Sequence, residues 1–210
     1  FGADLSAAEV VDRILADVRR EGDAALLRYT EAIDGARLDN LLVGEDEIEA
    51  GLRQVAPEVV AAMRVTAGRV EAFHRRQLRQ NWVSFDEHGT LGQIIRPLAR
   101  VGLYMPGGTA AYPSSLLMSA IPARVAGVEE IIVATPPGRD GTLPPVTLAA
   151  ARIAGAHRIV KAGGAQAIGA LAYGTASVPR VDKILGPGNI FVALAKERVF
   201  GQVAIDAIQG

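Results

Sequence analysis

Three glycine-rich segments in the second half of the sequence have the composition of turns that bind a phosphate group. They read Met105-Pro106-Gly107-Gly108, Ala162-Gly163-Gly164 and Gly186-Pro187-Gly188-Asn189. Glycine lets a backbone approach a ligand closely, and the free N–H groups at the start of a helix attract anions. Each segment joins an apolar run typical of a strand to a pattern typical of a helix. In an open α/β sheet such turns lie at one edge, so the sequence predicts that all three converge on one phosphate-bearing ligand.

A polar residue accompanies each turn. Tyr104 ends the first apolar run, Gln166 lies in the first turn of the helix after the second segment, and Asn189 ends the third segment. Each also has a purely structural interpretation: a core tyrosine with a satisfied hydroxyl, a solvent-exposed helix former, and a helix N-cap, respectively. A shared ligand site and a set of tight strand-to-helix turns are therefore both open interpretations.

The usual nucleotide-binding motifs are absent. The pair Gly186 and Gly188 lacks the third glycine of the dinucleotide fingerprint, because Phe191 stands in its place. The second predicted strand ends in Thr135-Pro136, where a dinucleotide-binding fold usually carries an acid for the ribose. A dinucleotide would therefore be bound in a non-standard way.

Other side chains suited to catalysis or metal binding are scarce. The sequence has no cysteine, which excludes disulfides, thiolate metal sites and a cysteine nucleophile. His74, His88 and His157 lack the spacing of metal ligands and are expected to be structural or solvent-facing. Asp182 and Asp206 merit inspection, because they flank predicted buried strands. The sequence thus predicts no catalytic residue and no metal ligand within these 210 residues.

The composition is that of a globular protein with a substantial core. The 210 residues are 50% hydrophobic and 21% charged, with a formal net charge of −1. These values exclude disorder and argue against nucleic-acid binding. An arginine-rich stretch from Arg64 to Arg79 can be a basic groove or a solvated helix face, and the neutral total charge favours the second.

One uncharged stretch, between Arg100 and Arg124, is long enough to span a membrane. It contains three prolines and a glycine pair, which would break a spanning helix. The stretch is therefore predicted to form a buried strand, a loop and a core helix. No membrane association is expected, and the absence of cysteine favours a cytoplasmic location.

The first hundred residues are predicted to be mainly helical. Ser6 and Glu9 form a capping box before one helix, and Gly22 ends it. Asp34-Gly35 is predicted to be a turn. A long helix begins at Pro57, with a buried face predicted to comprise Val60, Met63, Ala67, Val70 and Phe73. Residues 82–100 are predicted to form a strand, a turn at His88-Gly89 and a second strand.

From residue 101 onward, short apolar runs alternate with helical patterns. The predicted strands span residues 101–104, 130–134, 158–161, 183–185 and 203–208, and the predicted helices span residues 114–126, 143–154, 165–173 and 190–200. This order predicts an α/β fold with a parallel sheet covered on both faces. We divide the chain into a helical lobe with short strands, residues 1–99, and an α/β domain, residues 100–210.

Several of these motifs, in this order and spacing, resemble the histidinol dehydrogenase family. The segments that carry the resemblance are Gly22-Asp23-Ala24-Ala25, Leu91-Gly92-Gln93, Pro97-Leu98, Arg100-Val101-Gly102-Leu103-Tyr104-Met105-Pro106-Gly107-Gly108, Gly163-Gly164-Ala165-Gln166-Ala167-Ile168, Val181-Asp182-Lys183-Ile184, Gly186-Pro187-Gly188-Asn189 and Ala204-Ile205-Asp206. The resemblance implies an incomplete Rossmann-like domain, similar to the aldehyde dehydrogenase class, which agrees with the missing fingerprint. It makes residues 100–210 an NAD-binding-type domain.

The resemblance also implies an activity and a set of cofactors. The family oxidises L-histidinol to L-histidine through the aldehyde in histidine biosynthesis, reducing two NAD⁺, with a bound zinc ion and as a homodimer. It implies NAD contacts at Tyr104, Gln166 and Asn189. The family's zinc ligands and its Glu–His acid/base pair would follow Gly210, so we expect the chain to be an amino-terminal portion, inactive in isolation. The alternatives are an NAD-dependent alcohol dehydrogenase for another substrate and a non-catalytic nucleotide-binding module.

Overall fold

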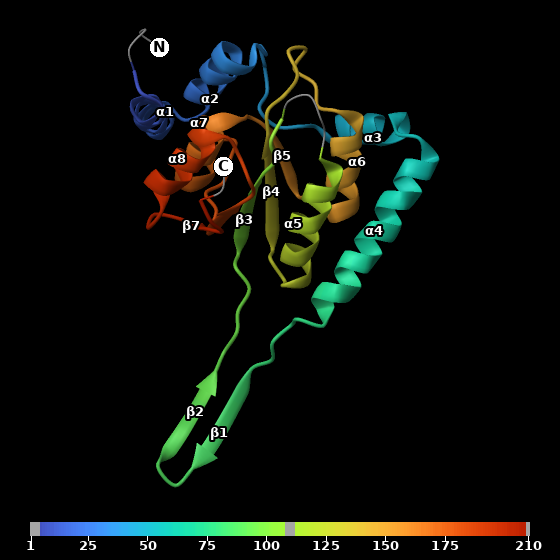
Figure 1. Cartoon of the computed structure of the whole chain (residues 1–210), viewed down its shortest axis with the longest axis vertical. Coiled ribbons are helices and arrows are strands. Elements are labelled where there is room, and N and C mark those ends of the chain that lie inside the picture. The colour runs from blue at the N-terminus through green and yellow to red at the C-terminus, as the bar shows by residue number, and fades with distance from the viewer. Residues whose placement is uncertain (1–4, 108–111, 209–210) are drawn as a thin grey trace.

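A five-stranded parallel sheet forms the centre of the molecule (Figure 1). The computed structural model describes residues 5–107 and 112–208. The strand order is β5-β4-β3-β6-β7. The strands are β3 (Arg100–Tyr104), β4 (Glu130–Thr135), β5 (Arg158–Lys161), β6 (Lys183–Leu185) and β7 (Ala204–Ile205). All neighbours pair in parallel, which confirms the predicted sheet. Strand β7 is shorter than the predicted 203–208.

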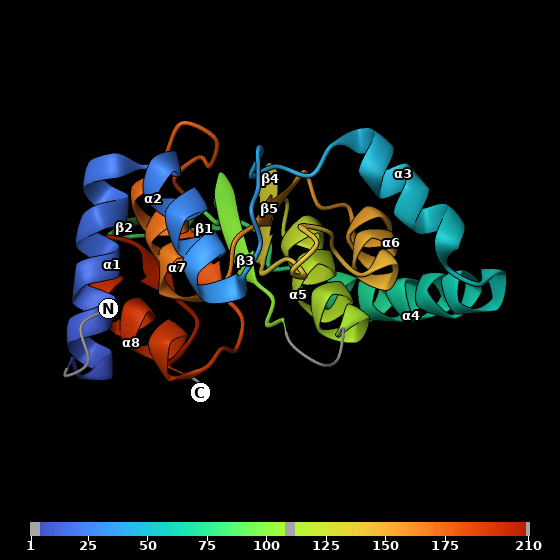
Figure 2. The same cartoon turned by 90° about the horizontal axis from the view of Figure 1, so that it is seen from above.

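Helices cover both faces of this sheet (Figure 2). One layer comprises α1 (Ala7–Glu21), α2 (Asp23–Tyr29), α7 (Gly164–Tyr173) and α8 (Ile190–Val199). The other comprises α3 (Glu45–Gln54), α4 (Pro57–Arg75), α5 (Pro113–Val125) and α6 (Pro145–Ala154). Alternate strand residues face the two layers: Ile132 and Ala134 belong to the first hydrophobic cluster, whereas Ile131 and Val133 belong to the second. Both faces of the sheet are therefore buried, as parallel strands require.

The predicted boundaries of the amino-terminal helices have clear local causes. The capping box of Ser6 and Glu9 is present at the start of α1, and Gly22 ends that helix with a φ of 58°. The sequence does not predict the segment after α2: residues Thr30–Asp34 form a short π-helix, η1, which ends at Gly35 with a left-handed φ of 72°. The predicted turn at Asp34-Gly35 is thus the end of a helical turn.

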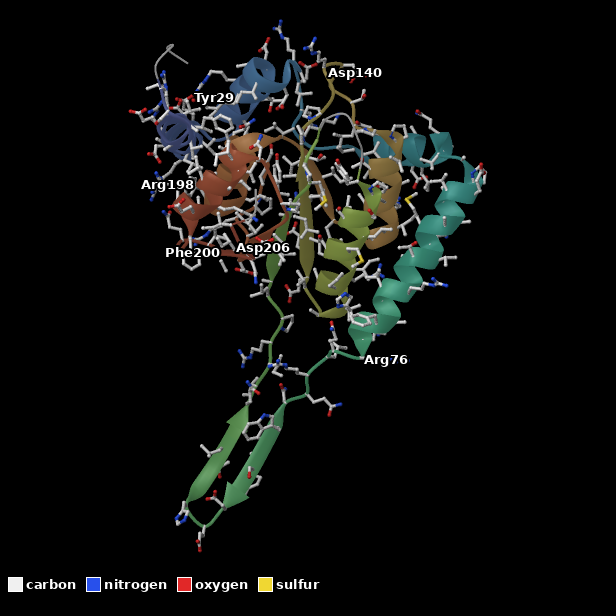
Figure 3. All side chains as sticks on the ribbon, viewed as in Figure 1. Tyr29, Arg76, Asp140, Arg198, Phe200 and Asp206 are labelled. Atoms are coloured by element: carbon white, nitrogen blue, oxygen red, sulfur yellow. The ribbon has the colours of Figure 1, made fainter. Side chains whose placement is uncertain are left out.

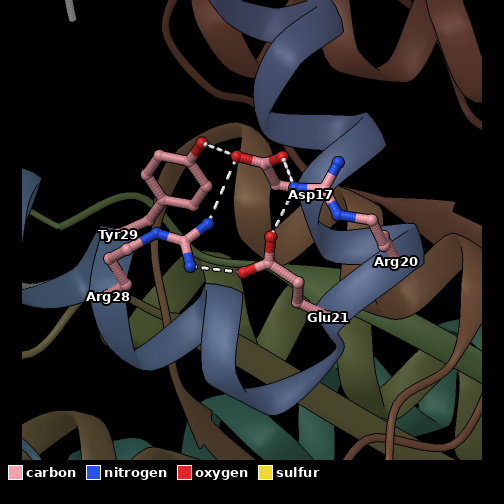
Figure 4. Close-up of polar contacts among 5 residues, drawn as sticks. All are labelled: Asp17, Arg20, Glu21, Arg28 and Tyr29. Carbon is pink, nitrogen blue, oxygen red and sulfur yellow. Dashed lines mark hydrogen bonds and ion pairs between the residues drawn. The ribbon is translucent and has the colours of Figure 1, made fainter.

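A polar network joins α1 to α2 (Figure 4). The Tyr29 hydroxyl donates a hydrogen bond of 2.6 Å to Asp17 Oδ2, and this bond is the main reason why the pKa of Asp17 is lowered. Arg28 pairs with Asp17 and Glu21, and Arg20 pairs with the same two acids. The network holds α2 and the following η1 in a fixed direction relative to α1.

A segment from the first hundred residues also pairs with the edge of the sheet. Leu42 forms an antiparallel bridge with Val160, and the Val43 N–H donates to the Ile159 carbonyl at 3.0 Å. This segment covers the β5 edge, which would otherwise present unpaired backbone groups. Because α1–α4 share both hydrophobic clusters with the sheet, the division at residue 100 remains a prediction from composition.

The predicted strand-turn-strand of residues 82–100 is a hairpin of β1 (Trp82–Asp86) and β2 (Gly89–Gln93) that extends away from the body (Figure 1). Every residue of both strands is exposed. The preceding helix α4 buries Met63, Ala67 and Val70 as predicted, but Phe73 is 61% exposed, so its predicted burial is wrong. Within the described residues, no helix is long and apolar enough to cross a membrane.

Candidate functional site

The order in which the chain adds strands to the sheet reverses between β3 and β6. From β3 the chain moves outward to β4 and β5, then returns to place β6 on the other side of β3. In open α/β sheets, ligands bind at the carboxyl ends of the strands at such a reversal. A cavity of about 910 Å³ lies there, lined by residues from several of these ends, including Tyr104, Thr135, Gly164 and Asn189. Its volume lies within the range of small-molecule sites.

Tyr104 is the last residue of β3 and lines this cavity, although only 4% of its surface is exposed. Its hydroxyl accepts a hydrogen bond of 3.1 Å from the Gly164 N–H, at the start of α7. Burial, reinforced by the nearby charge of Asp34 and opposed by the Gly164 hydrogen bond, raises the pKa of Tyr104. The hydroxyl therefore keeps its proton and can donate it in a hydrogen bond to a ligand.

Gln166 lies in the first turn of α7, two residues after Gly164, whose N–H binds Tyr104. Its side chain is fully buried, so the solvent-exposed interpretation from the sequence is wrong. Within the described residues neither Oε1 nor Nε2 has a hydrogen-bond partner. The amide lies close to Gly164, where an added Cβ would be 2.8 Å from Gln166 Oε1. Gln166 does not line the cavity, and its unpaired amide marks a buried polar position beside it.

Asn189 lines the cavity from the β6–α8 loop. Its Oδ1 accepts hydrogen bonds from the N–H groups of Phe191 and Val192 at 3.1 and 3.2 Å, so the N-cap interpretation is confirmed. Capping uses only the oxygen. Its Nδ2 has no hydrogen-bond partner among residues 5–107 and 112–208, which leaves it available to donate to a ligand.

An ion pair between a buried lysine and a partly exposed aspartate holds the loop that carries Asn189. Lys196 Nζ, fully buried in α8, donates to the Gly186 carbonyl at 2.6 Å and to Asp206 Oδ1 at 2.5 Å. Asp206 Oδ2 in turn accepts the Gly186 N–H at 2.8 Å. Asp206 itself is partly exposed, with 24% of its side chain accessible, and Figure 3 labels it on the ribbon. Burial raises the pKa of Asp206, but its hydrogen bonds to Lys196, Gly186 and Ala207 outweigh burial and leave the pKa lowered.

This ion pair also presses the loop against β3. Gly186 has a φ of 116°, and an added Cβ would lie 2.1 Å from the Tyr104 carbonyl oxygen. Only glycine fits there. The sequence singled out Asp206 but missed Lys196; the available signal was a lysine within an otherwise apolar helical face. In the second glycine-rich segment, a Cβ added to Gly163 would lie 2.6 Å from Cβ of Pro136. That glycine is therefore required for close packing against Pro136.

Asp34 is the other residue that sequence reasoning missed. It ends η1 and lines the same cavity, about 70 positions before Tyr104 in the chain. Its Oδ2 is buried and has no hydrogen-bond partner within the described residues. Burial raises the pKa of Asp34 to about 6. The sequence predicts only a turn at this position, because no pattern in the neighbouring residues indicates that η1 packs near the sheet.

The remaining candidates have structural roles. His74 Nδ1 is 2.7 Å from Gln77 Oε1, His157 Nδ1 accepts the Ile131 N–H at 3.0 Å, and His88 lies exposed in the hairpin turn. Asp182 Oδ2 accepts the Arg100 N–H at 2.8 Å. No group of three or more histidine, cysteine, aspartate or glutamate side chains that could hold a metal ion occurs in the part of the chain that the structure describes.

Comparison with known proteins places this chain and its fold in a family. The family model described as histidinol dehydrogenase matches residues 3–210. The chain is 57% identical over 203 residues to the histidinol dehydrogenase of Moorella thermoacetica, covering 95% of this chain and 48% of that protein. It is 54% identical over 210 residues to that of Deinococcus radiodurans, covering 100% of this chain and 48% of that protein.

A solved structure agrees with the sequence relatives. The crystal structure of histidinol dehydrogenase from Elizabethkingia anophelis matches with a TM-score of 0.94 and 36% identity, over 100% of this chain and 49% of that one. The chain thus spans about half the length of the curated relatives it matches. The match covers both helical layers, the sheet and the hairpin, and on this basis the chain belongs to the histidinol dehydrogenase family.

Proposed function

We propose that this chain is the NAD-binding portion of a histidinol dehydrogenase, an enzyme that oxidises L-histidinol to L-histidine through the aldehyde and reduces two NAD⁺. One observation carries the proposal. Tyr104 and Asn189 line a single cavity at the sheet reversal, beside the buried and unpaired amide of Gln166. Family membership supports the substrate and the place in histidine biosynthesis.

The residues around the cavity fit a dinucleotide. The Tyr104 hydroxyl and the Asn189 amide can donate hydrogen bonds, and Gln166 can supply either a donor or an acceptor. The starts of α7 and α8 lie at the same edge of the sheet. Asn189 and Tyr104 accept some of their first-turn N–H groups, and the positive ends of the two helix dipoles and the remaining N–H groups favour a pyrophosphate. When bound, NAD⁺ supplies the acceptor for the hydride that leaves the alcohol. The chain's own residues bind and orient it.

The zinc ion that the resemblance implies does not fit these residues. The described residues contain no cluster of three potential metal ligands, and no histidine lines the cavity. We therefore assign no metal-dependent step and no proton transfer to a residue of this chain. A cytoplasmic location and a homodimeric assembly remain part of the proposal for the whole enzyme, on the family resemblance alone.

Equilibrium titration of this chain with NAD⁺ tests the proposal. We expect saturable binding, weakened about tenfold by Tyr104→Phe, which removes a hydrogen-bonding hydroxyl from the cavity. Tyr173→Phe is the matched control, because Tyr173 lies outside the cavity beside Arg19. With L-histidinol added, we expect no NADH formation by this chain. Absence of NAD⁺ binding, or equal binding by Tyr104→Phe, would contradict the proposal.

A further inference from the structure

The cavity lacks an acid where dinucleotide-binding folds usually carry one. In such folds an aspartate or glutamate after the second strand accepts the hydroxyls of the adenosine ribose. Here the corresponding strand, β4, ends in Thr135 and continues into Pro136 and Pro137. None of these side chains can take the place of a carboxylate.

A carboxylate from elsewhere in the chain lies at that end of β4. Asp34, the last residue of η1, lines the cavity together with Thr135 and Pro136. The two segments lie close together: a Cβ built at Gly35 would be 3.6 Å from Cγ of Arg139, in the loop that follows β4. Figure 1 shows the segment after α2 passing beside the β4–α6 loop at the top of the sheet. The fold thus brings Asp34 to the carboxyl end of β4, where the strand itself carries no acid.

No hydrogen-bond donor within the described residues reaches Oδ2 of the Asp34 carboxyl. This oxygen is buried, and such an atom costs free energy unless a donor reaches it. The other titratable or charged residues that line the cavity are Tyr104, Tyr112 and Arg139. Arg139 is exposed, and no ion pair joins it to Asp34 in the described part of the chain. The missing donor is therefore expected to come from the ligand.

The local backbone supports this interpretation. Asp34 ends a π-helix, Thr30–Asp34. This conformation is rare in proteins as a whole, and where it occurs it is often found at functional sites. The Tyr29–Asp17 hydrogen bond fixes the helix immediately before it (Figure 4). Gly35 then turns the chain away with a left-handed φ of 72°. The carboxylate is thus carried at the end of a helical turn that the Asp17 network fixes from its amino-terminal side.

We propose that Asp34 accepts hydrogen bonds from the adenosine ribose hydroxyls of the bound dinucleotide and thereby selects NAD⁺ over NADP⁺. This inference rests on the proposed function. A vicinal diol supplies the donors that the half-buried carboxylate, with its buried Oδ2, lacks. A 2′-phosphate would instead place negative charge against the same carboxylate, which disfavours NADP⁺.

The test is a set of equilibrium titrations of this chain with NAD⁺, 2′-deoxy-NAD⁺ (lacking the adenosine 2′-hydroxyl) and NADP⁺. We expect the parent chain to bind NAD⁺ at least about tenfold more tightly than either analogue. Asp34→Asn is expected to weaken NAD⁺ binding about tenfold. It should weaken 2′-deoxy-NAD⁺ binding less, because that analogue has already lost one of the two hydroxyl contacts, and it should narrow the preference for NAD⁺ over NADP⁺. Asp39→Asn, an exposed acid on the same segment, is the matched control and should behave as the parent.

The outcomes separate this inference from the proposed function. If the parent binds NAD⁺ and Asp34→Asn binds all three nucleotides as the parent does, the role of Asp34 is wrong while the proposed function stands. Equal affinity of the parent for NAD⁺ and NADP⁺ overturns the role as well. If the parent binds no NAD⁺, both proposals fail. A circular dichroism spectrum of Asp34→Asn, expected to match the parent, distinguishes lost contacts from lost folding.

Discussion

Two residues at the candidate site carry polar atoms that the protein buries without hydrogen-bond partners. Gln166 and Asp34 both carry buried atoms with no hydrogen-bond partner among the described residues. Such groups reduce the stability of the ligand-free fold by about 1–3 kcal/mol each. Proteins tolerate this where a ligand completes the hydrogen bonds, so unpaired groups beside a cavity are a physical sign of function.

Asp34 is also expected to make the stability of the ligand-free chain depend on pH. Burial raises its pKa from 3.8 to about 6, so the folded chain holds this proton more tightly than the unfolded chain does. Its contribution to stability is therefore greatest below the unfolded pKa and is lost as the pH rises through about 6. We expect ligand-free Asp34→Asn to be more stable than the parent by about 1–2 kcal/mol near neutral pH, after allowance for partial solvent screening.

Urea denaturation at a neutral and an acidic pH measures this difference. The stabilising effect of Asp34→Asn should shrink toward zero near pH 4, where the parent carboxyl is protonated in the folded state. Asp39→Asn should show no such trend. A gain that is equal at both pH values would mean that the substitution acts through something other than the buried charge.

Among the elements, the β6–α8 loop depends most visibly on one interaction. Lys196 and Asp206 hold both the N–H and the carbonyl of Gly186, which fixes the loop that presents Asn189. Lys196→Met removes the buried ammonium that donates to Asp206 Oδ1 and to the Gly186 carbonyl, while Asp206 keeps its bonds from the Gly186 and Ala207 N–H groups. Because Asp206 is partly exposed and keeps its backbone hydrogen bonds, we expect the variant to lower the free energy of unfolding by about 1–3 kcal/mol.

Two further variants make this measurement specific. Lys183→Met removes a half-buried lysine that has no ion pair among the described residues, and it should cost less than about 0.5 kcal/mol. The double variant Lys196→Met/Asp206→Asn should recover part of the loss, because no unpaired charge remains. Strictly additive single effects would show that the two side chains do not act as a pair.

The same elements show how far sequence reasoning reaches. The strands Arg158–Lys161 and Lys183–Leu185 were predicted to the residue, because short apolar runs bounded by turns fix buried parallel strands locally. The prediction for Phe73 was wrong, because helical periodicity continues past the point where α4 has a neighbour to pack against. The position of Asp34 depends on long-range packing of η1 onto the β4–α6 loop, which no local pattern encodes.

Across the whole molecule, the site is assembled from both halves of the sequence. Strands β3 and β6 and helices α7 and α8 supply the turns and the three polar residues singled out from the sequence. The amino-terminal helices share their hydrophobic clusters with the sheet and bring Asp34 to the cavity. We therefore regard the proposed NAD site as a property of the folded body rather than of the α/β segment alone.

The most direct test of this proposed site is an NMR titration of the isotopically labelled chain with NAD⁺. We predict saturable shifts concentrated at the backbone amides of Gly164 and Asn189, the side-chain amide of Gln166 and the backbone of Asp34. The exposed hairpin strand Trp82–Asp86 should stay unchanged and serves as the internal reference. Shifts confined to other surfaces, or no saturable shift, would contradict the assignment of the cavity as the NAD site.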